Sequence, residues 1–487
     1  MMVKYLQKES ARKAKTLADG MRHVYKFLSK QISVTDFWMP LGLKLDPENR
    51  WVKKAETIPW EEIELRYAAL FGNHKGNVAK PLRMALGALL IQAERGISDV
   101  EVPLQIQEAP CLQYFCGLPG YEDKQPFDPS LMVYFRKRLT PQILGEINEM
   151  VIAKAEKKEP PPPPEEKACG RPNKGTLTVD ATCAPQNIRY PLDTSLLNEA
   201  REKLEGMVDE LHDPKEGLKP RTYRRKARRE HLKTAKKRKK SKKEIRGAIK
   251  KQLQYIRRDL GTVETYMASG KALSERELER LSTIKTLYEQ QLVMYKTGTH
   301  KVENRIVSLS QPWVRPIVRG KAKANCEFGA KLDISVVNGF TRLEYTSFDA
   351  YNEAGNLIDI IERYRDREGH YPERVLADGI YRNRDNLAYC GEHGIRLLGK
   401  PLGRPRKDAA QNKQQRRKDE IDRVEAERKF SHAKGSFGLG LIRTKLKLTS
   451  ETVIALSVLA LNIALAGRFL LAFLSRFCVQ PNFVFVQ

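Results

Sequence analysis

Thr176-Leu-Thr-Val-Asp180 and Arg374-Val-Leu-Ala-Asp378 are the two stretches that decide the fold of this chain. Each is a short apolar run typical of a buried strand, and each closes with an aspartate. A third acidic residue, Glu427, follows within a basic helical segment. Side chains at the carboxyl ends of neighbouring strands lie at one edge of a sheet. Two such aspartates and a helical glutamate would supply the hard oxygen ligands that two divalent metal ions prefer.

The length and charge of the chain narrow the class of protein and of partner. At 487 residues the chain exceeds the size of one compact core, which predicts about two to four domains. Its 88 Lys and Arg residues outnumber its 60 Asp and Glu residues and give a net charge of +28. Between residues 221 and 251, 17 basic residues stand against two glutamates. This excess favours a polyanionic partner, either nucleic acid or an acidic membrane surface.

The cysteines and the N-terminal sequence indicate a cytoplasmic protein. The seven cysteines are odd in number and form no Cys-x-x-Cys pair. That pattern is typical of a reducing compartment rather than of a secreted disulfide framework. The Lys-rich N-terminal sequence also lacks the apolar segment of a secretory signal.

One apolar segment near the C-terminus is either a core helix or a membrane helix. From Val453 to Ala466 only Ser457 and Asn462 are polar. This run of 14 residues is shorter than the roughly 20 that span a bilayer. Arg468 interrupts any extension of the run. We therefore expect a buried core helix and no membrane association.

Changes in composition divide the chain into predicted domains. Five consecutive prolines, Pro160 to Pro164, indicate a semi-rigid linker. Helices are predicted over 81–91 and 128–139, and their Arg and Lys clusters suit either DNA binding or a solvated surface. The predicted order is a basic N-terminal region over 1–60, a helical DNA-binding domain over 61–153, the linker over 154–174, a core over 175–211 and 301–475, and a basic helical insertion over 212–300.

The core and its insertion predict an α/β fold with a mixed sheet flanked by helices. Strand patterns over 326–337 and 341–348 flank Asn338-Gly339, which is a strong hairpin-turn signal. Helical spacing over 249–295 predicts a helical hairpin, which would either mediate dimerisation or pack against its own core. Asp193 precedes another helical pattern and is predicted to cap it, with a place in the functional site as the alternative.

Each acidic residue also has an ordinary structural interpretation. An aspartate at a strand end often caps a turn, and a glutamate in a charged helix often faces solvent. Arg423 and Glu427 could form a plain i,i+4 ion pair, although the order with arginine first is the less favourable one. Arg423, Glu427 and Lys434 nevertheless share one helical stripe, and two cations beside a carboxylate suit a groove that holds phosphate oxygens. The combination favours a functional site.

Together these residues resemble the bacterial insertion-sequence transposases of the DDE type, in the branch of the IS-four and IS-five groups. The signature of that branch is tyrosine, two residues, arginine, three residues, glutamate, six residues and lysine. Arg423, Glu427 and Lys434 match its last three positions, and Glu420 occupies the position of the tyrosine. The spacing selects Glu427 over Glu425.

Shorter motifs extend the resemblance along the chain. Val179-Asp-Ala-Thr182 with Tyr190-Pro-Leu-Asp193 is similar to the first-aspartate region of IS-five-type enzymes. Ala377-Asp-Gly-Ile-Tyr381 with Asn383-Arg-Asp-Asn386 is similar to their second-aspartate region. Residues 81–139 resemble their helical N-terminal domain.

The resemblance implies an RNase H-like catalytic core and a transposase that binds the terminal inverted repeats of its element. It implies two Mg²⁺ or Mn²⁺ ions on Asp180, Asp378 and Glu427, which would cleave DNA strands and join them to target DNA. Arg423 and Lys434 would contact the double-stranded DNA. Further DNA contacts are expected from Arg224, Arg225, Lys236, Lys237 and Arg238.

The same resemblance implies a homodimer on DNA in the bacterial cytoplasm, associated with the nucleoid. A catalytically inactive transposase-derived DNA-binding protein is an alternative, because Glu420 departs from the signature. A structure-selective nuclease on the same core is a second alternative. A membrane-associated basic protein is a third.

Overall fold

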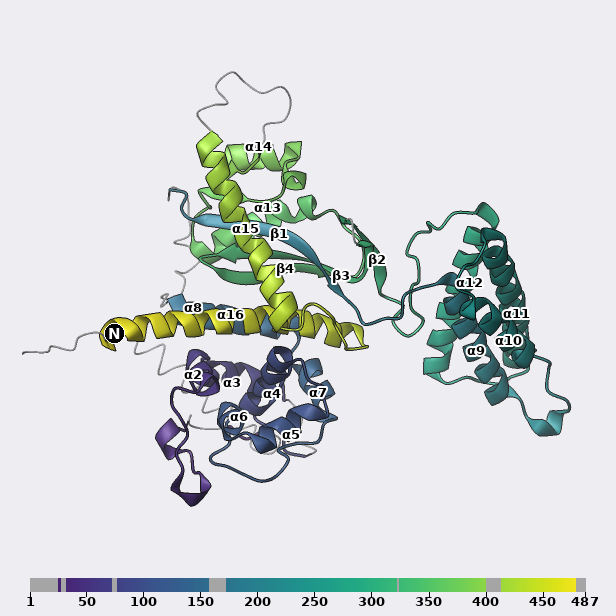
Figure 1. The fold of residues 1–487 in the computed structure, drawn as a ribbon, viewed down its shortest axis with the longest axis horizontal. Coiled ribbons are helices and arrows are strands. Elements are labelled where there is room, and N and C mark those ends of the chain that lie inside the picture. Colours follow the sequence, from purple (N-terminus) through teal and green to yellow (C-terminus); the bar gives the residue numbers. More distant parts are fainter. Residues whose placement is uncertain are drawn as a thin grey trace, which may run out of the picture. The chain divides into compact units, whose positions relative to one another are not determined.

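The structure of the chain, a computed structural model, is shown in Figure 1. It describes residues 25–27, 32–71, 77–156, 172–321, 324–399 and 413–478. The chain divides into two compact units. The first unit holds residues 1–184, 332–346 and 352–487, and the second holds residues 185–331 and 347–351. Most of the predicted proline-rich linker lies outside the described residues.

Helices form the N-terminal part of the first unit. They are α2 (Arg50–Thr57), α3 (Trp60–Ala68), α4 (Leu82–Arg95), α5 (Glu101–Glu108), α6 (Pro110–Phe115), α7 (Leu131–Arg138) and α8 (Pro141–Glu156). α4 follows Pro81, and Gly96 caps its C-terminal end in the left-handed conformation with φ of +65°. Residues 82–91 of α4 are all buried, as a nearly continuous run of apolar and small side chains requires. The helices predicted over 81–91 and 128–139 are confirmed as α4 and α7.

In the described part of the chain, six strands form one mixed sheet: β1 (Thr176–Pro185), β2 (Arg315–Lys321), β3 (Ala324–Val337), β4 (Phe340–Ser347), β5 (Arg374–Leu376) and β6 (Arg396–Leu397). They pair in the order β2-β3-β1-β5-β6, and β4 also pairs with β3. β2 and β3 are antiparallel, whereas β1, β5 and β6 are parallel. β3 begins in the second unit and enters the first at Leu332. The predicted α/β class is confirmed, and the arrangement is consistent with an RNase H-like fold.

The connection between β3 and β4 is the hairpin turn predicted at Asn338-Gly339. Both residues have positive φ, +51° for Asn338 and +81° for Gly339. A two-residue turn of the I′ type needs this conformation at both central positions, and asparagine and glycine tolerate it best. Local sequence therefore fixes the register of this hairpin.

Two helices cover one face of the parallel part of the sheet. They are α13 (Leu357–Glu368) and α14 (Arg384–Glu392). Leu177 and Val179 of β1 and Val375 of β5 are buried in one cluster with Ile360 of α13. Successive side chains of a strand point to opposite faces of its sheet. The even-numbered residues of β1, among them Asp180, therefore point to the other face.

The second unit is a helical insertion with a core of its own. Its helices are α9 (Asp193–Leu211), α10 (Arg224–Lys236), α11 (Lys242–Ala268) and α12 (Glu275–Thr297). Leu197 of α9, Ile256 of α11 and Ile284 of α12 are buried in the same cluster. α11 and α12 are the two helices of the predicted hairpin. Their apolar side chains pack within their own unit, which favours the simpler of the two interpretations of that hairpin.

Asp193 differs from the predicted helix cap. It is the first residue of α9, and the N-cap position is held by Leu192. Its Oδ1 instead accepts hydrogen bonds from Gln291 Nε2 and from Arg305, both at 2.8 Å. The prediction of a cap is wrong because these distant donors hold the carboxylate and join the start of α9 to α12.

The C-terminal helices of the first unit are α15 (Lys413–Ser436) and α16 (Lys447–Cys478). Among the described residues, one helical segment, Lys447–Arg468 of α16, is long and apolar enough to cross a membrane by length and composition. Within this segment, 72% of the most apolar window is buried inside the protein. α16 packs on α2, α4, α7 and α8. It is therefore placed as a core helix, as the sequence predicts.

Short 3-10 helices occur as η1 (Val34–Asp36), η2 (Pro40–Gly42), η4 (Pro214–Glu216), η5 (Glu353–Asn356) and η6 (Gly379–Tyr381).

Asn462 joins α16 to the sheet and to an N-terminal helix. Its Nδ2 donates to the carbonyl oxygen of Thr341 on β4 at 2.6 Å and to Asn148 Oδ1 on α8 at 2.7 Å. Its Oδ1 accepts from the backbone N–H of Thr341 at 2.9 Å. All three residues are buried, so each unmade bond would leave a polar group without water. One amide side chain thus links three elements of the first unit.

We expect Asn462→Ala to lower the free energy of unfolding by about 2–4 kcal/mol, because it leaves both backbone groups of Thr341 and the amide of Asn148 without this partner. Urea denaturation monitored by circular dichroism would measure the change. Ser457→Ala on the same buried helix is the control, since within the described ranges Ser457 Oγ bonds to its own helix alone, at Val453 O. A loss of less than about 1 kcal/mol is expected there, and equal losses in the two variants would contradict the linking role of Asn462.

Candidate active site

The pairing of β1 with β5 brings the two predicted aspartates level with each other. The strands are parallel, with Thr176 opposite Arg374 and Thr178 opposite Leu376. Continuing this register by two residues sets Asp180 opposite Asp378. Neighbouring strands lie about 4.8 Å apart, and residues in register point to the same face. These strands do pair, which is the condition for the two aspartates to be neighbours. The expectation that the first strand ends at Asp180 is wrong, because β1 continues to Pro185.

Each aspartate also accepts a hydrogen bond from the residue that follows it. Asp378 is the N-cap of η6, and its Oδ1 accepts from the N–H of Gly379 at 2.6 Å. Asp180 Oδ1 accepts from the N–H of Ala181 at 2.8 Å. These bonds orient one oxygen of each carboxylate and leave the other oxygen available for a ligand.

Burial and neighbouring charges raise the pKa of Asp180 to about 6. Loss of hydration is the largest cause, and the negative charges of Asp378 and Glu427 add to it. The N–H of Ala181 and the positive charge of Arg423 act in the opposite direction. The three predicted carboxylates and Arg423 therefore lie close enough to share one electrostatic field. Such a concentration of like charges favours the binding of a cation.

Glu427 is held by Arg423 on the same helix. Glu427 Oε1 lies 3.1 Å from a guanidinium nitrogen of Arg423, and the glutamate side chain is 52% exposed. The i,i+4 ion pair between Arg423 and Glu427, which the sequence suggests as an ordinary structural role, is therefore present. It is a weak one, since exposed i,i+4 pairs contribute about 0.5 kcal/mol, and it leaves Glu427 free to rotate. Neighbouring Glu425 instead reaches the β3–β4 turn, where its Oε1 lies 3.5 Å from the position that a Cβ on Gly339 would take.

Lys434 lies apart from this group. It lines a cavity of about 890 Å³ at the C-terminal end of α15, together with Phe437, Arg95 and Val133. Another lining residue, Arg443, donates a hydrogen bond to the carbonyl of residue 96 at 2.9 Å. The structure thus groups Asp180, Asp378, Arg423 and Glu427, and it places Lys434 at a separate cavity.

One arginine connects the three elements that carry the carboxylates. Arg374 of β5 donates from Nε to Thr176 Oγ1 on β1 at 2.7 Å. Its two terminal nitrogens donate to Asp419 Oδ1 and Asp422 Oδ2 on α15, each at 2.8 Å. Thr176 lies four residues before Asp180, as Arg374 lies before Asp378, and the two aspartates of α15 precede Glu427. The guanidinium therefore fixes the two strands and the helix relative to one another.

A second arginine completes the anchor of α15. Arg396 of β6 forms an ion pair with Asp419, whose side chain is only 1% exposed. Asp419 thus receives guanidinium donors from two neighbouring strands, as a buried carboxylate requires. Sequence analysis missed this cluster because acidic residues in a charged helix usually face solvent. Two acidic residues three apart, two turns before the candidate glutamate, are the only signal it leaves.

Tyr381 places a hydroxyl group near the candidate carboxylates. The residue is 1% exposed, and its hydroxyl has no hydrogen-bond partner in the described part of the chain. Burial, followed by the negative charges of Asp333 and Asp180, raises the pKa of this phenol far above its ordinary value. The hydroxyl therefore keeps its proton and can donate a hydrogen bond to a carboxylate or to a water in the site.

The donor set of the site fits a hard divalent cation, although its side chains are not yet gathered around one point. Asp180, Asp378 and Glu427 offer carboxylate oxygens, which Mg²⁺ and Mn²⁺ prefer. In the described ranges, no group of three or more His, Cys, Asp or Glu side chains is close enough to hold a metal ion. Rotation of Glu427 away from Arg423 is the movement that coordination would require.

The other predicted DNA contacts lie on α10 and just after it, in the second unit. Arg224 is engaged within the protein, where it donates to both carboxylate oxygens of Asp209. Lys237 forms an ion pair with Glu244 at the start of α11. The remaining three are exposed, without an acidic partner among the described side chains: Arg225, Lys236 and Arg238.

Two parts of the chain match known protein families. Residues 40–138 match a transposase domain (DUF772), and residues 375–464 match the transposase DDE domain. Over 187 residues the chain is 28% identical to the "Uncharacterized protein ORF8 in nfe locus" of Rhizobium meliloti, an alignment that covers 38% of this chain and 83% of that protein. No solved structure matches the chain. The two family matches support an insertion-sequence transposase as the class of this protein.

We expect Arg374→Met to lower the free energy of unfolding by about 2–4 kcal/mol, because it removes one of the guanidinium donors of the buried Asp419. Denaturant titration would measure the loss. Arg365→Met is the control, because Arg365 forms a surface ion pair with Glu362, for which a change of at most about 1 kcal/mol is expected. A loss no larger than that of the control would show that Arg374 does not anchor α15.

Asp180→Asn is expected to stabilise the folded protein by about 1–2 kcal/mol at pH 7.5 without added divalent cations. The folded pKa of about 6 lies above the ordinary value, so the ionised carboxylate costs stability. That cost is absent below about pH 4, grows as the pH rises to about 6, and is complete above it. Thermal unfolding of both proteins from pH 4 to 8 would test this. A stability difference that does not change with pH would contradict the assignment.

Proposed function

We propose that this chain is a DDE transposase of the IS-four/IS-five superfamily. It binds the terminal inverted repeats of an insertion sequence and catalyses Mg²⁺-dependent strand cleavage and strand transfer. The parallel register of β1 and β5 carries this proposal, because it sets Asp180 level with Asp378 in a field shared with Glu427. The match of residues 375–464 to the transposase DDE domain supports it.

Asp180, Asp378 and Glu427 would hold two Mg²⁺ or Mn²⁺ ions. When bound, such a pair activates the attacking water or 3′-hydroxyl and stabilises the leaving oxygen of the phosphodiester. The role of the protein is to hold the two aspartates in register and to let Glu427 turn toward them. Arg423 would then release Glu427 and pair with a phosphate oxygen of the DNA, and Lys434 would contact the backbone at the end of α15.

The DNA would be held by several parts of the chain. The helices of residues 61–153 are proposed to contact the terminal repeats, and the basic segment 221–251 of the second unit is proposed to add affinity through phosphate contacts. Two element ends must be brought together, so a homodimer on DNA is proposed. Its place is the bacterial cytoplasm, in association with the nucleoid.

The test is cleavage of a labelled duplex that carries the terminal repeat of the element, with Mg²⁺, by the wild type, Glu427→Gln and Glu425→Gln. The wild type should cut at the repeat boundary. Glu427→Gln should cut at least about 100-fold more slowly, since loss of a metal ligand removes several kcal/mol of transition-state stabilisation. Glu425→Gln, two residues away on the same helix, should stay within about threefold of the wild type.

Each other outcome selects a different function. Tight binding of the repeat by all three proteins without any cleavage would favour a catalytically inactive transposase-derived DNA-binding protein. Equal cleavage of unrelated duplexes would favour a structure-selective nuclease. Equal loss in both glutamine variants would remove the assignment of Glu427 as the metal ligand.

A further inference from the structure

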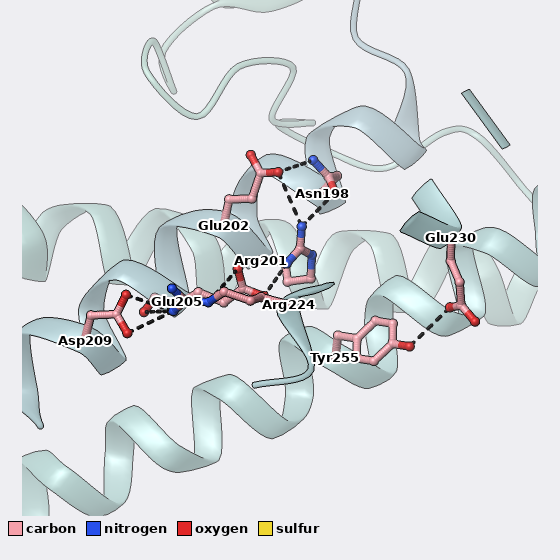
Figure 2. Close-up of polar contacts among 8 residues, drawn as sticks. All are labelled: Asn198, Arg201, Glu202, Glu205, Asp209, Arg224, Glu230 and Tyr255. Atoms are coloured by element: carbon pink, nitrogen blue, oxygen red, sulfur yellow. Dashed lines mark hydrogen bonds and ion pairs between the residues drawn. The ribbon is translucent and has the colours of Figure 1, made fainter. Parts of the chain in front are cut away.

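One face of α10 is fixed to the helices beneath it, as Figure 2 shows. Ala227 on this face is completely buried. Arg224 donates to both carboxylate oxygens of Asp209 on α9, at 2.9 and 2.8 Å. Glu230 accepts a hydrogen bond from Tyr255 on α11 at 3.1 Å. Contacts in the first turn of the helix and in its middle therefore hold α10 in one orientation on α9 and α11.

The support on α9 is itself held by a buried arginine. Arg201 is 1% exposed and forms an ion pair with Glu205. It also donates to Asn198 Oδ1 at 3.0 Å, while the carbonyl oxygen of Glu205 accepts from Arg224 at 3.3 Å (Figure 2). Charged groups this deeply buried must be paired, which makes the cluster costly to disrupt. α10 thus rests on a fixed polar base rather than on a loose surface.

The opposite face of α10 carries five cations: Arg225, Arg228, Arg229, Lys233 and Lys236. They recur at spacings of three and four residues, which forms one stripe on a helix. Together with Leu232 they line a shallow hollow of about 590 Å³. All five are exposed, and in the part of the chain that the structure describes none forms an ion pair with an acidic side chain. We call this stripe the α10 basic face.

The composition of the α10 basic face selects the kind of partner. Five like charges along about 16 Å of helix repel one another unless an external polyanion neutralises them. Leu232 is the only apolar side chain that lines the hollow, whereas a helix that binds a membrane needs a broad apolar face. No aromatic side chain lines it, so it offers no platform on which unpaired bases could stack. The phosphates of a nucleic-acid duplex supply the negative charge and require neither an apolar face nor an aromatic platform.

We propose that the α10 basic face binds the sugar-phosphate backbone of duplex DNA without reading its sequence. This inference rests on the proposed function for its substrate, and it assigns a defined part of the DNA affinity to one face of one helix. A helix segment of about 16 Å matches about five base pairs of duplex, which offer phosphates on both strands along a groove. Arg224 lies on the face of α10 that packs on α9 and α11, so it orients the helix and makes no contact with the DNA.

The test compares two full-length triple variants with the wild type in binding a duplex of unrelated sequence at a series of KCl concentrations. The first variant is Arg228→Gln, Arg229→Gln, Lys233→Gln on the α10 basic face. The matched control is Arg276→Gln, Lys296→Gln, Lys301→Gln, three exposed cations elsewhere in the second unit. We expect the slope of log Kd against log salt to fall by about 3 for the first variant, since each phosphate contact contributes about 0.9. The control should change it by less than about 1.

The same salt series with the terminal repeat, duplex RNA and anionic lipid vesicles, together with the cleavage assay above, separates this inference from its rivals. An unchanged slope in the first variant, or an equal fall in the control, would overturn it. A loss confined to the terminal repeat would overturn backbone binding, because it would mean that the face reads sequence. If binding of duplex RNA or of anionic lipid vesicles falls in the first variant while DNA binding does not, the partner is wrong. The expected slope change without any cleavage of the terminal repeat would contradict the proposed function alone.

Discussion

The geometry of the candidate active site depends on the guanidinium of Arg374. Its donors reach β1 and α15 from β5, so the strands and helix that carry Asp180, Asp378 and Glu427 meet on a single planar group. A planar guanidinium presents its donors in fixed directions, whereas a lysine ammonium is a single mobile point charge. Arg374 and Asp378 are four residues apart, so the pleat of the strand sets the anchor and the carboxylate on the same face.

This anchor opposes a repulsion that the site itself creates. Asp180 is buried, and loss of hydration raises its pKa to about 6, with the negative charges of Asp378 and Glu427 adding to the shift. A lone set of carboxylates would relax by moving apart. The ion pairs of Arg374 on β5 with Asp419 and Asp422 on α15 limit that movement within the first unit. Functional sites commonly contain unfavourable local features, such as like charges held close together, whose cost the surrounding structure must offset.

The sequence predicts the parts of this arrangement that rest on local patterns. The apolar strands before Asp180 and Asp378 and the turn at Asn338-Gly339 follow from residue types within a few positions. The long-range partners do not. Arg374 and Asp419 look like solvated charges in the sequence, because the burial of Asp419 results from the packing of α15 against distant strands. Tertiary contacts likewise give a residue such as Asp193 a role that its local position does not indicate.

The basic segment of the second unit shows why composition alone cannot assign its charges. In the sequence every cation from 221 to 251 is equally suited to DNA. Folding divides them, because a helix presents one face to its neighbours and the other to solvent. Arg224 falls on the inner face and is paired with Asp209, whereas Arg228 and Lys233 fall on the outer face, where the described side chains offer them no acidic partner. Affinity for a polyanion comes only from charges that the protein leaves unpaired, so the buried polar base of α10 decides which cations can bind.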